Sequence, residues 1–358
     1  MSSATPVTIL TGFLGSGKTT LLNHLLAQPG MAETAVLINE FGEVAIDHLL
    51  VEEVQEGVTL LASGCICCTV QGELVDALRE LYLDRVQGDI PHFTRLMIET
   101  TGLADPAPII AALGRDPMFK SWYRLEGIVT TVDTVLGDTQ LDENEEAVKQ
   151  AAVADRIVLT KCDLAEGAQI AALMARLGRL NPGADMIEVR HGAVEPDALL
   201  QTGAYDPETK TADVGRWINE AAYEARSDHH DHDHRHADGA HAHSRHDDRI
   251  GSFVLTFEQP VDWQAFSKAL NALIKEHGAE LLRVKGIVNA SDSQRPLAIH
   301  AVQHTQHPPS YLNAWPDEDR RSRIVFITRD LDRATVEKAF AHWADPSDGV
   351  AAEGAAKA

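Results

Sequence analysis

The chain has 358 residues, of which 44% are hydrophobic and 24% charged, and its formal net charge is −23. These proportions are typical of a globular protein with two or three domains. The negative net charge argues against nucleic acid or an anionic membrane as a partner. The sequence contains no run of 18 apolar residues, so we expect no membrane-spanning helix. The negative net charge suits a protein that attracts cations. The N-terminus lacks a basic region and an apolar signal core, and cysteines are few, so we expect a cytoplasmic protein.

A glycine-rich loop near the N-terminus matches the phosphate-binding pattern G-x-x-x-x-G-K-[ST]. It lies between an apolar run at 7–10 and an apolar helical pattern at 21–26, which is the context this motif requires. The alternative is a glycine-rich turn that contains a lysine by chance, which the strand and helix patterns on either side disfavour. Lys18 would reach the β- and γ-phosphates as a catalytic residue, and the Thr19 hydroxyl would bind Mg²⁺. The predicted phosphate contacts are Gly12, Gly15, Ser16, Gly17, Lys18, Thr19 and Thr20.

Short apolar runs alternate with amphipathic helical patterns up to about residue 220. In the helical pattern at 70–86, Leu74, Leu78 and Leu81 share a face with Val75. The alternation predicts βαβ units and a mostly parallel sheet, in which ligands bind at the carboxyl ends of the strands. The expected strands are 6–11, 35–39, 57–62, 94–99, 126–132, 156–160 and 185–189.

Residues 227–249 interrupt this pattern with a segment rich in histidine and aspartate, including eight histidines between 229 and 246. Without large apolar side chains it cannot form a core, so we predict a disordered linker. Its imidazoles would collect divalent metal through weak, overlapping sites, unless the segment is merely a solvated connection.

Ordered structure is expected again from residue 250. Strand patterns at 252–258, 281–289, 297–304 and 323–328, with helices at 263–276 and 331–342, predict a small α+β domain with an antiparallel sheet. The predicted organisation is a nucleotide-binding domain at 1–226, the linker at 227–249, the α+β domain at 250–345 and a flexible tail at 346–358.

Two further motifs follow predicted strands. Thr160-Lys161-Cys162-Asp163 resembles the lysine-x-aspartate with which GTPases read guanine, although the usual first residue is Asn. Lys161 and Asp163 are therefore predicted to bind the base, because adenine offers the wrong hydrogen-bonding groups to a carboxylate. Glu99-Thr100-Thr101-Gly102 is predicted to support Mg²⁺ through Glu99 and to approach the γ-phosphate through Gly102. The alternative for the second motif is an ordinary polar turn.

Three cysteines lie together in Gly64-Cys65-Ile66-Cys67-Cys68. Thiolates are soft ligands that suit Zn²⁺, Cu(I) or Co²⁺, so Cys65, Cys67 and Cys68 are candidate metal ligands. Three thiols leave one position of a tetrahedral zinc ion open, which favours delivery of the metal over permanent binding. A redox switch and inert buried cysteines are the alternatives.

These motifs, with Asn39 to Asp47 and Glu99 to Pro106 in the same order, resemble the CobW family of SIMIBI-class P-loop GTPases. The resemblance covers the first domain, and the last hundred or so residues are similar to the C-terminal domain of that family. It implies GTP hydrolysis coupled to transfer of a divalent metal, usually zinc or cobalt. It also implies that Glu43 is an extra metal ligand and that Asp47 contacts Mg²⁺. In GTPases a loop at the position of His191-Gly192 touches the guanine.

The resulting hypothesis is a GTP-hydrolysing metallochaperone that uses GTP, Mg²⁺ and Zn²⁺ or Co²⁺. Its client would be a metalloprotein or a protein of a cobalamin pathway, and a homodimer is one candidate assembly. A metal-buffering or storage protein that uses nucleotide only as a regulator is the alternative. An ATP-dependent kinase is a third hypothesis, which Lys161 and Asp163 disfavour.

Overall fold

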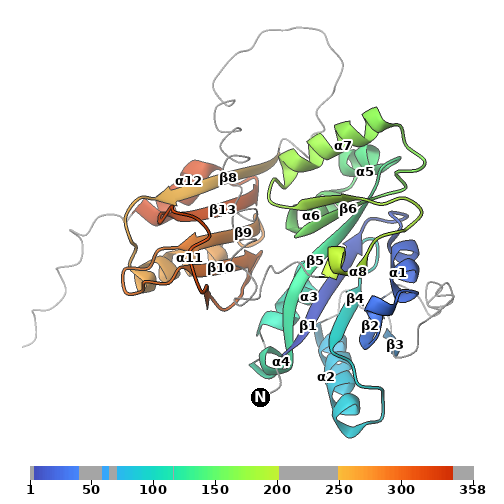
Figure 1. Ribbon diagram of the computed structural model, residues 1–358. Coiled ribbons are helices and arrows are strands. Elements are labelled where there is room, and N and C mark those ends of the chain that lie inside the picture. Colours follow the sequence, from blue (N-terminus) through green and yellow to red (C-terminus); the bar gives the residue numbers. More distant parts are fainter. Residues whose placement is uncertain (1–3, 40–58, 64–70, 116, 201–248, 342–358) are drawn as a thin grey trace, which may run out of the picture.

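The computed structural model describes residues 4–39, 59–63, 71–115, 117–200 and 249–341. Within these residues, the first domain is built on a seven-stranded parallel sheet in the order β3-β2-β4-β1-β5-β6-β7 (Figure 1). The central strand β1 leads directly into the glycine-rich loop, and its neighbours β4 and β5 end beside that loop. The strands are β1 (Thr5–Gly12), β2 (Thr34–Asn39), β3 (Thr59–Ser63), β4 (Arg95–Glu99), β5 (Tyr123–Asp133), β6 (Arg156–Thr160) and β7 (Asp185–Glu188).

Helices cover both faces of this sheet because alternate strand residues are apolar on both sides. On one face, Leu10 of β1 packs in a cluster with α1 and α8. On the second face, Ile9 packs in another cluster with α2, α3 and α4. Helices α5, α6 and α7 cover β5 and β6 on the second face. The helices are α1 (Lys18–Leu26), η1 (Pro29–Met31), α2 (Gln71–Gln87), α3 (Ala107–Arg115), α4 (Pro117–Trp122), α5 (Gly137–Glu143), α6 (Glu145–Val153), α7 (Gly167–Leu180) and α8 (Pro196–Leu200).

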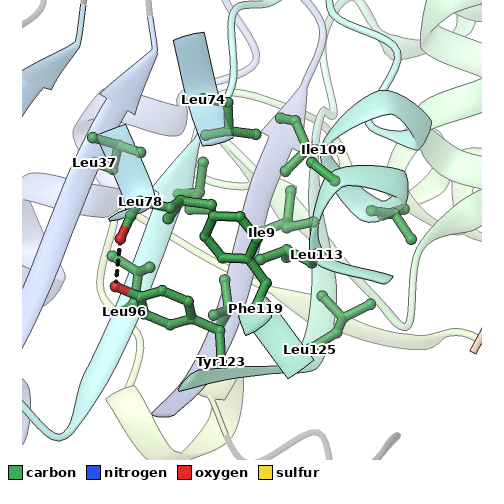
Figure 2. Close-up of a cluster of buried hydrophobic side chains, with 14 of the residues drawn as sticks. Ile9, Leu37, Leu74, Leu78, Leu96, Ile109, Leu113, Phe119, Tyr123 and Leu125 are labelled. Carbon is green, nitrogen blue, oxygen red and sulfur yellow. Dashed lines mark hydrogen bonds between the residues drawn. The ribbon is translucent and has the colours of Figure 1, made fainter. Parts of the chain in front are cut away.

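The cluster on the second face fixes α2 and α3 against the sheet (Figure 2). Leu74, Leu78 and Leu81 of α2 are buried, with Val75 partly buried beside them, so the predicted helix face is confirmed. The Tyr123 hydroxyl donates a 3.0 Å hydrogen bond to the carbonyl of Leu78 inside this cluster. Burial raises the pKa of Tyr123 well above its usual range, so the hydroxyl keeps the proton that it donates.

The second domain is an antiparallel sheet with two helices on one side (Figure 1). The strand order is β11-β10-β9-β13-β8, and β12 pairs with β10. Apolar residues of α11 and α12 pack on the sheet around Phe266 and Phe340, whose rings stack with centroids 5.2 Å apart. The elements are β8 (Ile250–Phe257), α11 (Trp263–His277), β9 (Leu281–Val288), β10 (Leu297–Val302), β11 (Thr305–Gln306), β12 (Ser310–Tyr311), β13 (Ser322–Arg329) and α12 (Arg333–Ala341).

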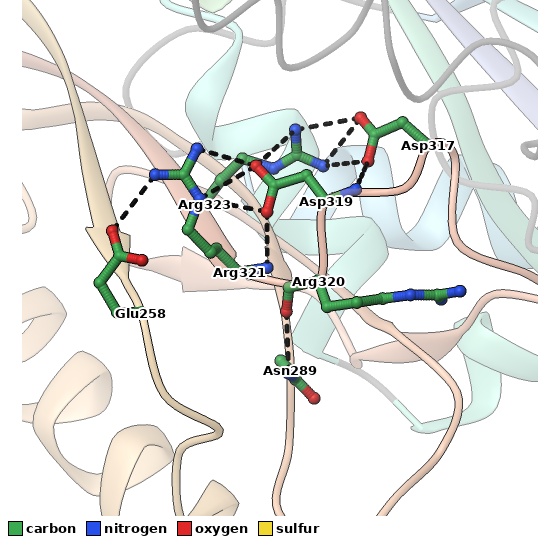
Figure 3. Close-up of polar contacts among 7 residues, drawn as sticks. All are labelled: Glu258, Asn289, Asp317, Asp319, Arg320, Arg321 and Arg323. Atoms are coloured by element: carbon green, nitrogen blue, oxygen red, sulfur yellow. Dashed lines mark hydrogen bonds and ion pairs between the residues drawn. The ribbon is translucent and has the colours of Figure 1, made fainter.

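A network of ion pairs organises the loop that enters β13 (Figure 3). Arg323, which is only 7% exposed, donates to both carboxylate oxygens of Asp317 at 3.0 and 3.1 Å. Arg321 likewise donates to both carboxylate oxygens of Asp319, and it also donates to Glu258 at 3.2 Å. Bidentate arginine–carboxylate pairs have a defined geometry, so this network fixes the conformation of the loop.

The two domains pack against each other through both apolar and charged side chains. Ile250, Leu282 and Ile327 of the second domain belong to the same buried cluster as the facing residues of α6 and α7. Glu145, the first residue of α6, pairs with Arg249 at 3.2 Å and with Arg329 at 3.1 Å. The second domain is therefore joined to the helices that cover β5 and β6.

The predicted fold class is confirmed: an α/β domain with a parallel sheet is followed by a smaller α+β domain. Every predicted strand is present, with ends shifted by a few residues. The short strands β11 and β12 were not predicted, because two-residue strands carry no periodic pattern. The histidine-rich linker up to residue 248 and the tail from 342 lie outside the described residues.

Candidate functional site

The loop between β1 and α1 has a backbone that glycine adopts without strain. The φ angle is +146° at Gly12, +70° at Gly15 and +88° at Gly17. A Cβ atom on Gly12 would lie 2.1 Å from the Thr131 hydroxyl oxygen and 2.7 Å from that of Ser16. A side chain at Gly12 would thus displace the groups that support the loop.

The N-terminus of α1 has no side-chain cap, and its N-cap residue is Gly17. The first N–H groups of a helix need partners, and an uncapped N-terminus attracts anions. Lys18, the first residue of α1, is buried and donates to the carbonyls of Gly12 at 2.8 Å and Phe13 at 3.1 Å. The loop therefore places the Lys18 ammonium group beside the N-terminus of α1, which suits a phosphate.

Buried hydroxyl groups join the strand ends beneath this loop. The Ser16 and Thr131 hydroxyls share a 2.7 Å hydrogen bond, which links the loop to β5. The Thr160 hydroxyl donates to the Ser16 carbonyl at 2.7 Å, which links the loop to β6. The Thr100 hydroxyl donates to that of Thr11 at 2.8 Å, which links β4 to β1.

A cavity of about 620 Å³ opens above these strand ends. It is large enough for a nucleoside triphosphate-sized ligand. Its lining combines the glycine-rich loop with the ends of β2, β4 and β6. The lining residues are Leu14, Gly15, Gly17, Lys18, Thr19, Thr20, Ile38, Glu99, Thr100, Thr101, Gly102, Leu103 and Lys161.

Lys161 enters this cavity from the loop after β6, with a φ of +58°. Its ammonium group lies 2.6 Å from a carboxylate oxygen of Asp133, which is fully buried at the end of β5. The other oxygen of Asp133 accepts hydrogen bonds from the backbone N–H groups of Val135 at 2.7 Å and Leu136 at 3.2 Å. Asp133 thus fixes both the turn after β5 and the position of the Lys161 ammonium group.

Asp163 lies two residues further along the same loop and contacts His191. The His191 N–H donates to one carboxylate oxygen at 3.1 Å, and the imidazole Nδ1 lies 3.3 Å from the other. The hydrogen bond from the His191 backbone is the main cause of a lowered pKa at Asp163, so the carboxylate is ionised. The loop at His191-Gly192, predicted to lie near the base, therefore contacts the predicted guanine-binding carboxylate.

The residues after β4 form a turn against the glycine-rich loop. Glu99 is 3% exposed and lines the cavity at the end of β4. The Ala104 N–H donates to the Thr101 carbonyl at 3.1 Å, which closes the turn around Gly102. A Cβ atom on Gly102 would lie 2.7 Å from the backbone nitrogen of Leu14, so only glycine allows this approach.

The structure therefore brings most of the predicted nucleotide-binding residues to one cavity. Three of them are not among its lining residues: Gly12, Ser16 and Asp163, the last of which lies two residues after the lining residue Lys161. Among the described residues, no group of three or more His, Cys, Asp or Glu side chains could hold a metal ion. Of the predicted metal ligands, Thr19 lines the cavity. The others lie outside the described residues: Glu43, Asp47, Cys65, Cys67 and Cys68.

Sequence reasoning missed three side chains of this site. Thr131 and Asp133 are polar residues at the end of β5, and a polar residue at the end of a parallel strand was the signal that could have identified them. Gln150 lies within α6, fully buried, and donates to the carbonyls of Gly102 at 3.3 Å and Ala104 at 3.0 Å. Nothing in the helical pattern of α6 distinguishes Gln150 from a surface residue.

The fold and the cavity define a P-loop nucleotide-binding protein. Comparison with known families then gives the family: residues 6–188 match the CobW/HypB/UreG nucleotide-binding domain, and residues 250–344 match the cobalamin synthesis protein CobW C-terminal domain. The chain belongs to this family, as the sequence motifs predicted.

Several curated relatives cover nearly the whole chain. The zinc chaperone YjiA of Escherichia coli is 34% identical over 335 residues, which are 94% of this chain and 97% of the relative. The zinc chaperone CobW of Pseudomonas aeruginosa is 31% identical, over 92% of this chain and 89% of the relative. A crystal structure of Zn(II)-bound YjiA GTPase from E. coli matches with a TM-score of 0.70 at 31% identity, over 96% of this chain and 99% of that chain.

Among the described residues, no helix has the length and apolar character needed to cross a membrane.

Proposed function

We propose that this protein is a GTP-hydrolysing metallochaperone that binds zinc and transfers it to a client protein. The observation that carries the proposal is the glycine-rich loop, where Lys18 and the uncapped N-terminus of α1 face a cavity that Glu99 and Lys161 also line. The relatives named zinc chaperones, and the structurally similar YjiA GTPase, support both the nucleotide and the metal.

Guanine is the base that the loop after β6 fits best. An ionised Asp163 can accept hydrogen bonds from the ring N–H and the exocyclic amine of guanine, whereas adenine would leave the carboxylate unpaired. Lys161, held by Asp133, supplies a fixed cation at the same edge of the cavity. His191 holds the Asp163 carboxylate from its other side.

The residues also fit a Mg²⁺ ion. Thr19 at the start of α1 and Glu99 at the end of β4 supply oxygen ligands, which Mg²⁺ prefers. When bound, Mg²⁺ neutralises charge on the phosphate oxygens. Lys18 would hold the β- and γ-phosphates, and the Gly102 turn would bring backbone close to the γ-phosphate. Loss of the γ-phosphate would then remove a contact of this turn.

The metal site is proposed at the thiols of Cys65, Cys67 and Cys68. Strand β3 ends at Ser63, one residue before the cysteine motif, and Ser63 pairs with Asn39 at the end of β2. The segment that contains Glu43 and Asp47 follows β2, so both candidate segments start from neighbouring strand ends. This placement supports a metal site whose geometry responds to the nucleotide. The proposed transfer of zinc to a client protein is supported by the relatives that are named zinc chaperones. It does not depend on any surface of the described residues.

The experiment that tests the proposal is titration of the full chain with zinc and with cobalt. Each titration is run with and without Mg²⁺ and a non-hydrolysable GTP analogue. We expect one tight zinc site that strengthens at least about tenfold with the analogue, because a ligand that prefers one state shifts the equilibrium toward it. Zinc affinity that ignores the analogue would favour the alternative, a metal-buffering protein.

Two cysteine variants localise that site. Cys67→Ala should abolish the tight zinc site, because it removes one of three candidate thiolates. Cys162→Ala is the matched control: Cys162 is a buried free thiol in the loop after β6, and its removal should leave the zinc stoichiometry unchanged. GTP hydrolysis is measured in parallel, with ATP as the competing nucleotide. Equal affinity for ATP would contradict the guanine assignment.

A further inference from the structure

The C-terminal domain reaches the turn that follows β4 through one side chain. The amide nitrogen of Gln303 donates a 2.9 Å hydrogen bond to the Oδ2 atom of Asp105. The Oδ1 atom of the same carboxylate accepts the N–H of Ala107 at 2.9 Å, at the start of α3. Asp105 therefore lies between the cavity-lining Gly102 turn and α3, and both of its oxygens are engaged.

Gln303 is itself held rigidly. It occupies the turn between β10 and β11 with a φ of +48°, and its N–H donates to the Leu281 carbonyl at 2.9 Å. The preceding residue, Val302, is 1% exposed and packs in the apolar cluster of the first domain with residues of α3. At the other end of α3, a Cβ on Gly114 would lie 3.0 Å from Thr305 of β11. The β10–β11 hairpin is thus seated along α3.

The segment from Gly102 to Asp105 is consequently held on three sides. The backbone of Leu14 packs against Gly102, the buried Gln150 side chain of α6 binds the carbonyls of Gly102 and Ala104, and Gln303 binds Asp105. Gly102 and Leu103 line the cavity at the point proposed for the γ-phosphate. A displacement of Asp105 would move the peptide groups that face the cavity, because only two residues separate it from Gly102.

We propose that Gln303 of the C-terminal domain is a positioning residue for GTP hydrolysis, acting through Asp105 on the turn that meets the γ-phosphate. This inference rests on the proposed function, since it assigns a role within the same reaction. The C-terminal domain then takes part in the nucleotide cycle. The Gln303–Asp105 hydrogen bond involves neither the phosphate loop nor Lys161 or Asp163, so we expect the affinity for the base and for the first two phosphates to depend little on Gln303.

The test compares steady-state kcat and KM for GTP in the full chain. Gln303→Ala should lower kcat roughly 3- to 10-fold, the net size of a typical hydrogen bond, while KM changes less than about twofold. Gln306→Ala is the matched control, because it removes the same side chain from β11 three residues away. It should leave kcat within about twofold of the wild type.

A compensating pair separates positioning from general stability. Gln303→Glu would place two carboxylates together and should lower kcat more than Gln303→Ala. In the double variant Asp105→Asn/Gln303→Glu, the amide donates to the new carboxylate while its oxygen still accepts from Ala107, so kcat should recover. Unchanged kcat in Gln303→Ala, or no recovery of kcat in the double variant, would overturn the inference. The proposed function would still stand if the wild-type chain hydrolyses GTP. A wild-type chain that hydrolyses no GTP would overturn both.

Discussion

The hydroxyl of Thr160 donates a 2.7 Å hydrogen bond to the backbone carbonyl of Ser16, and so joins the end of β6 to the glycine-rich loop. The two residues are 144 positions apart in the chain, and both are buried. The Thr134 hydroxyl in turn donates to the Thr160 carbonyl at 2.8 Å. Thr160 departs from the asparagine usual at the start of a guanine-binding motif, yet its hydroxyl still links the end of β6 to the glycine-rich loop.

Thr160→Val should weaken GTP binding. The valine has nearly the same shape but leaves the buried Ser16 carbonyl without this donor, at a cost of about 1–3 kcal/mol. We expect the affinity for GTP, measured by calorimetry, to fall roughly 5- to 10-fold. Thr134→Val is the control, since it removes a buried hydroxyl of the same network that donates to the Thr160 carbonyl instead of to the glycine-rich loop. Equal losses in both variants would mean that the Thr160–Ser16 contact has no specific role.

Asp133→Asn should reduce GTP affinity roughly tenfold, because Lys161 loses its ion pair while the backbone hydrogen bonds to the side-chain oxygen remain. In a Lys161→Ala background the same substitution should have little further effect, and this double-mutant cycle is the measurement. Asp138→Asn is the control, because the exposed Asp138 pairs with Arg176 away from the cavity. Additive losses in the cycle would contradict a positioning role for Asp133.

Asp163→Asn should change the preferred nucleotide from GTP to xanthosine triphosphate. In the proposed site the carboxylate would accept two hydrogen bonds from guanine, whereas an amide can donate to the additional carbonyl oxygen of xanthine. We expect the affinity for GTP to fall at least about 100-fold and the affinity for xanthosine triphosphate to rise in parallel. Competition between the two nucleotides measures the exchange. A loss of GTP affinity without any gain for xanthosine triphosphate would place Asp163 in a structural role instead.

The sequence was sufficient for the fold because its signals are local. Apolar runs predicted each long strand, and the 3.6-residue period of Leu74, Leu78 and Leu81 predicted the buried face of α2. Motifs at strand ends predicted the residues around the cavity, since the parallel sheet brings those ends together. Lys18, Glu99, Gly102 and Lys161 line one cavity for this reason.

The supporting side chains could not be predicted in this way. Gln150 and Gln303 hold the Gly102 turn although they lie at least 46 residues along the sequence from the groups they bind. Their contacts exist only once α6 and the β10–β11 hairpin have packed. Neither residue lies in a motif, and a glutamine in a helix or a turn is usually solvated. Long-range pairing of this kind depends on tertiary structure, so it was beyond reasoning from periodicity and composition.

A buried charge cluster joins the two domains and is the second feature without a sequence signal. Asp155, immediately before β6, pairs with Arg283 and with Lys285 of β9, the latter at 2.8 Å. All three side chains are at most 5% exposed. Burial on its own raises the pKa of Asp155, but the two cations outweigh it and hold that pKa below its usual range. Burial, together with repulsion from Arg283, lowers the pKa of Lys285 from 10.5 to about 8.

The cluster predicts how stability depends on pH. Between pH 8 and 10.5 the folded chain binds fewer protons at Lys285 than the unfolded chain, so this residue makes the free energy of unfolding rise with pH across that window. Lys285→Met should lack that rise, and urea unfolding of both proteins at pH 7.5 and pH 10 measures the difference. Asp155→Asn is the contrasting variant: it removes the carboxylate that pairs with both buried cations and should cost about 3–5 kcal/mol at neutral pH. A constant difference in unfolding free energy between wild type and Lys285→Met at the two pH values would refute the depressed pKa of Lys285.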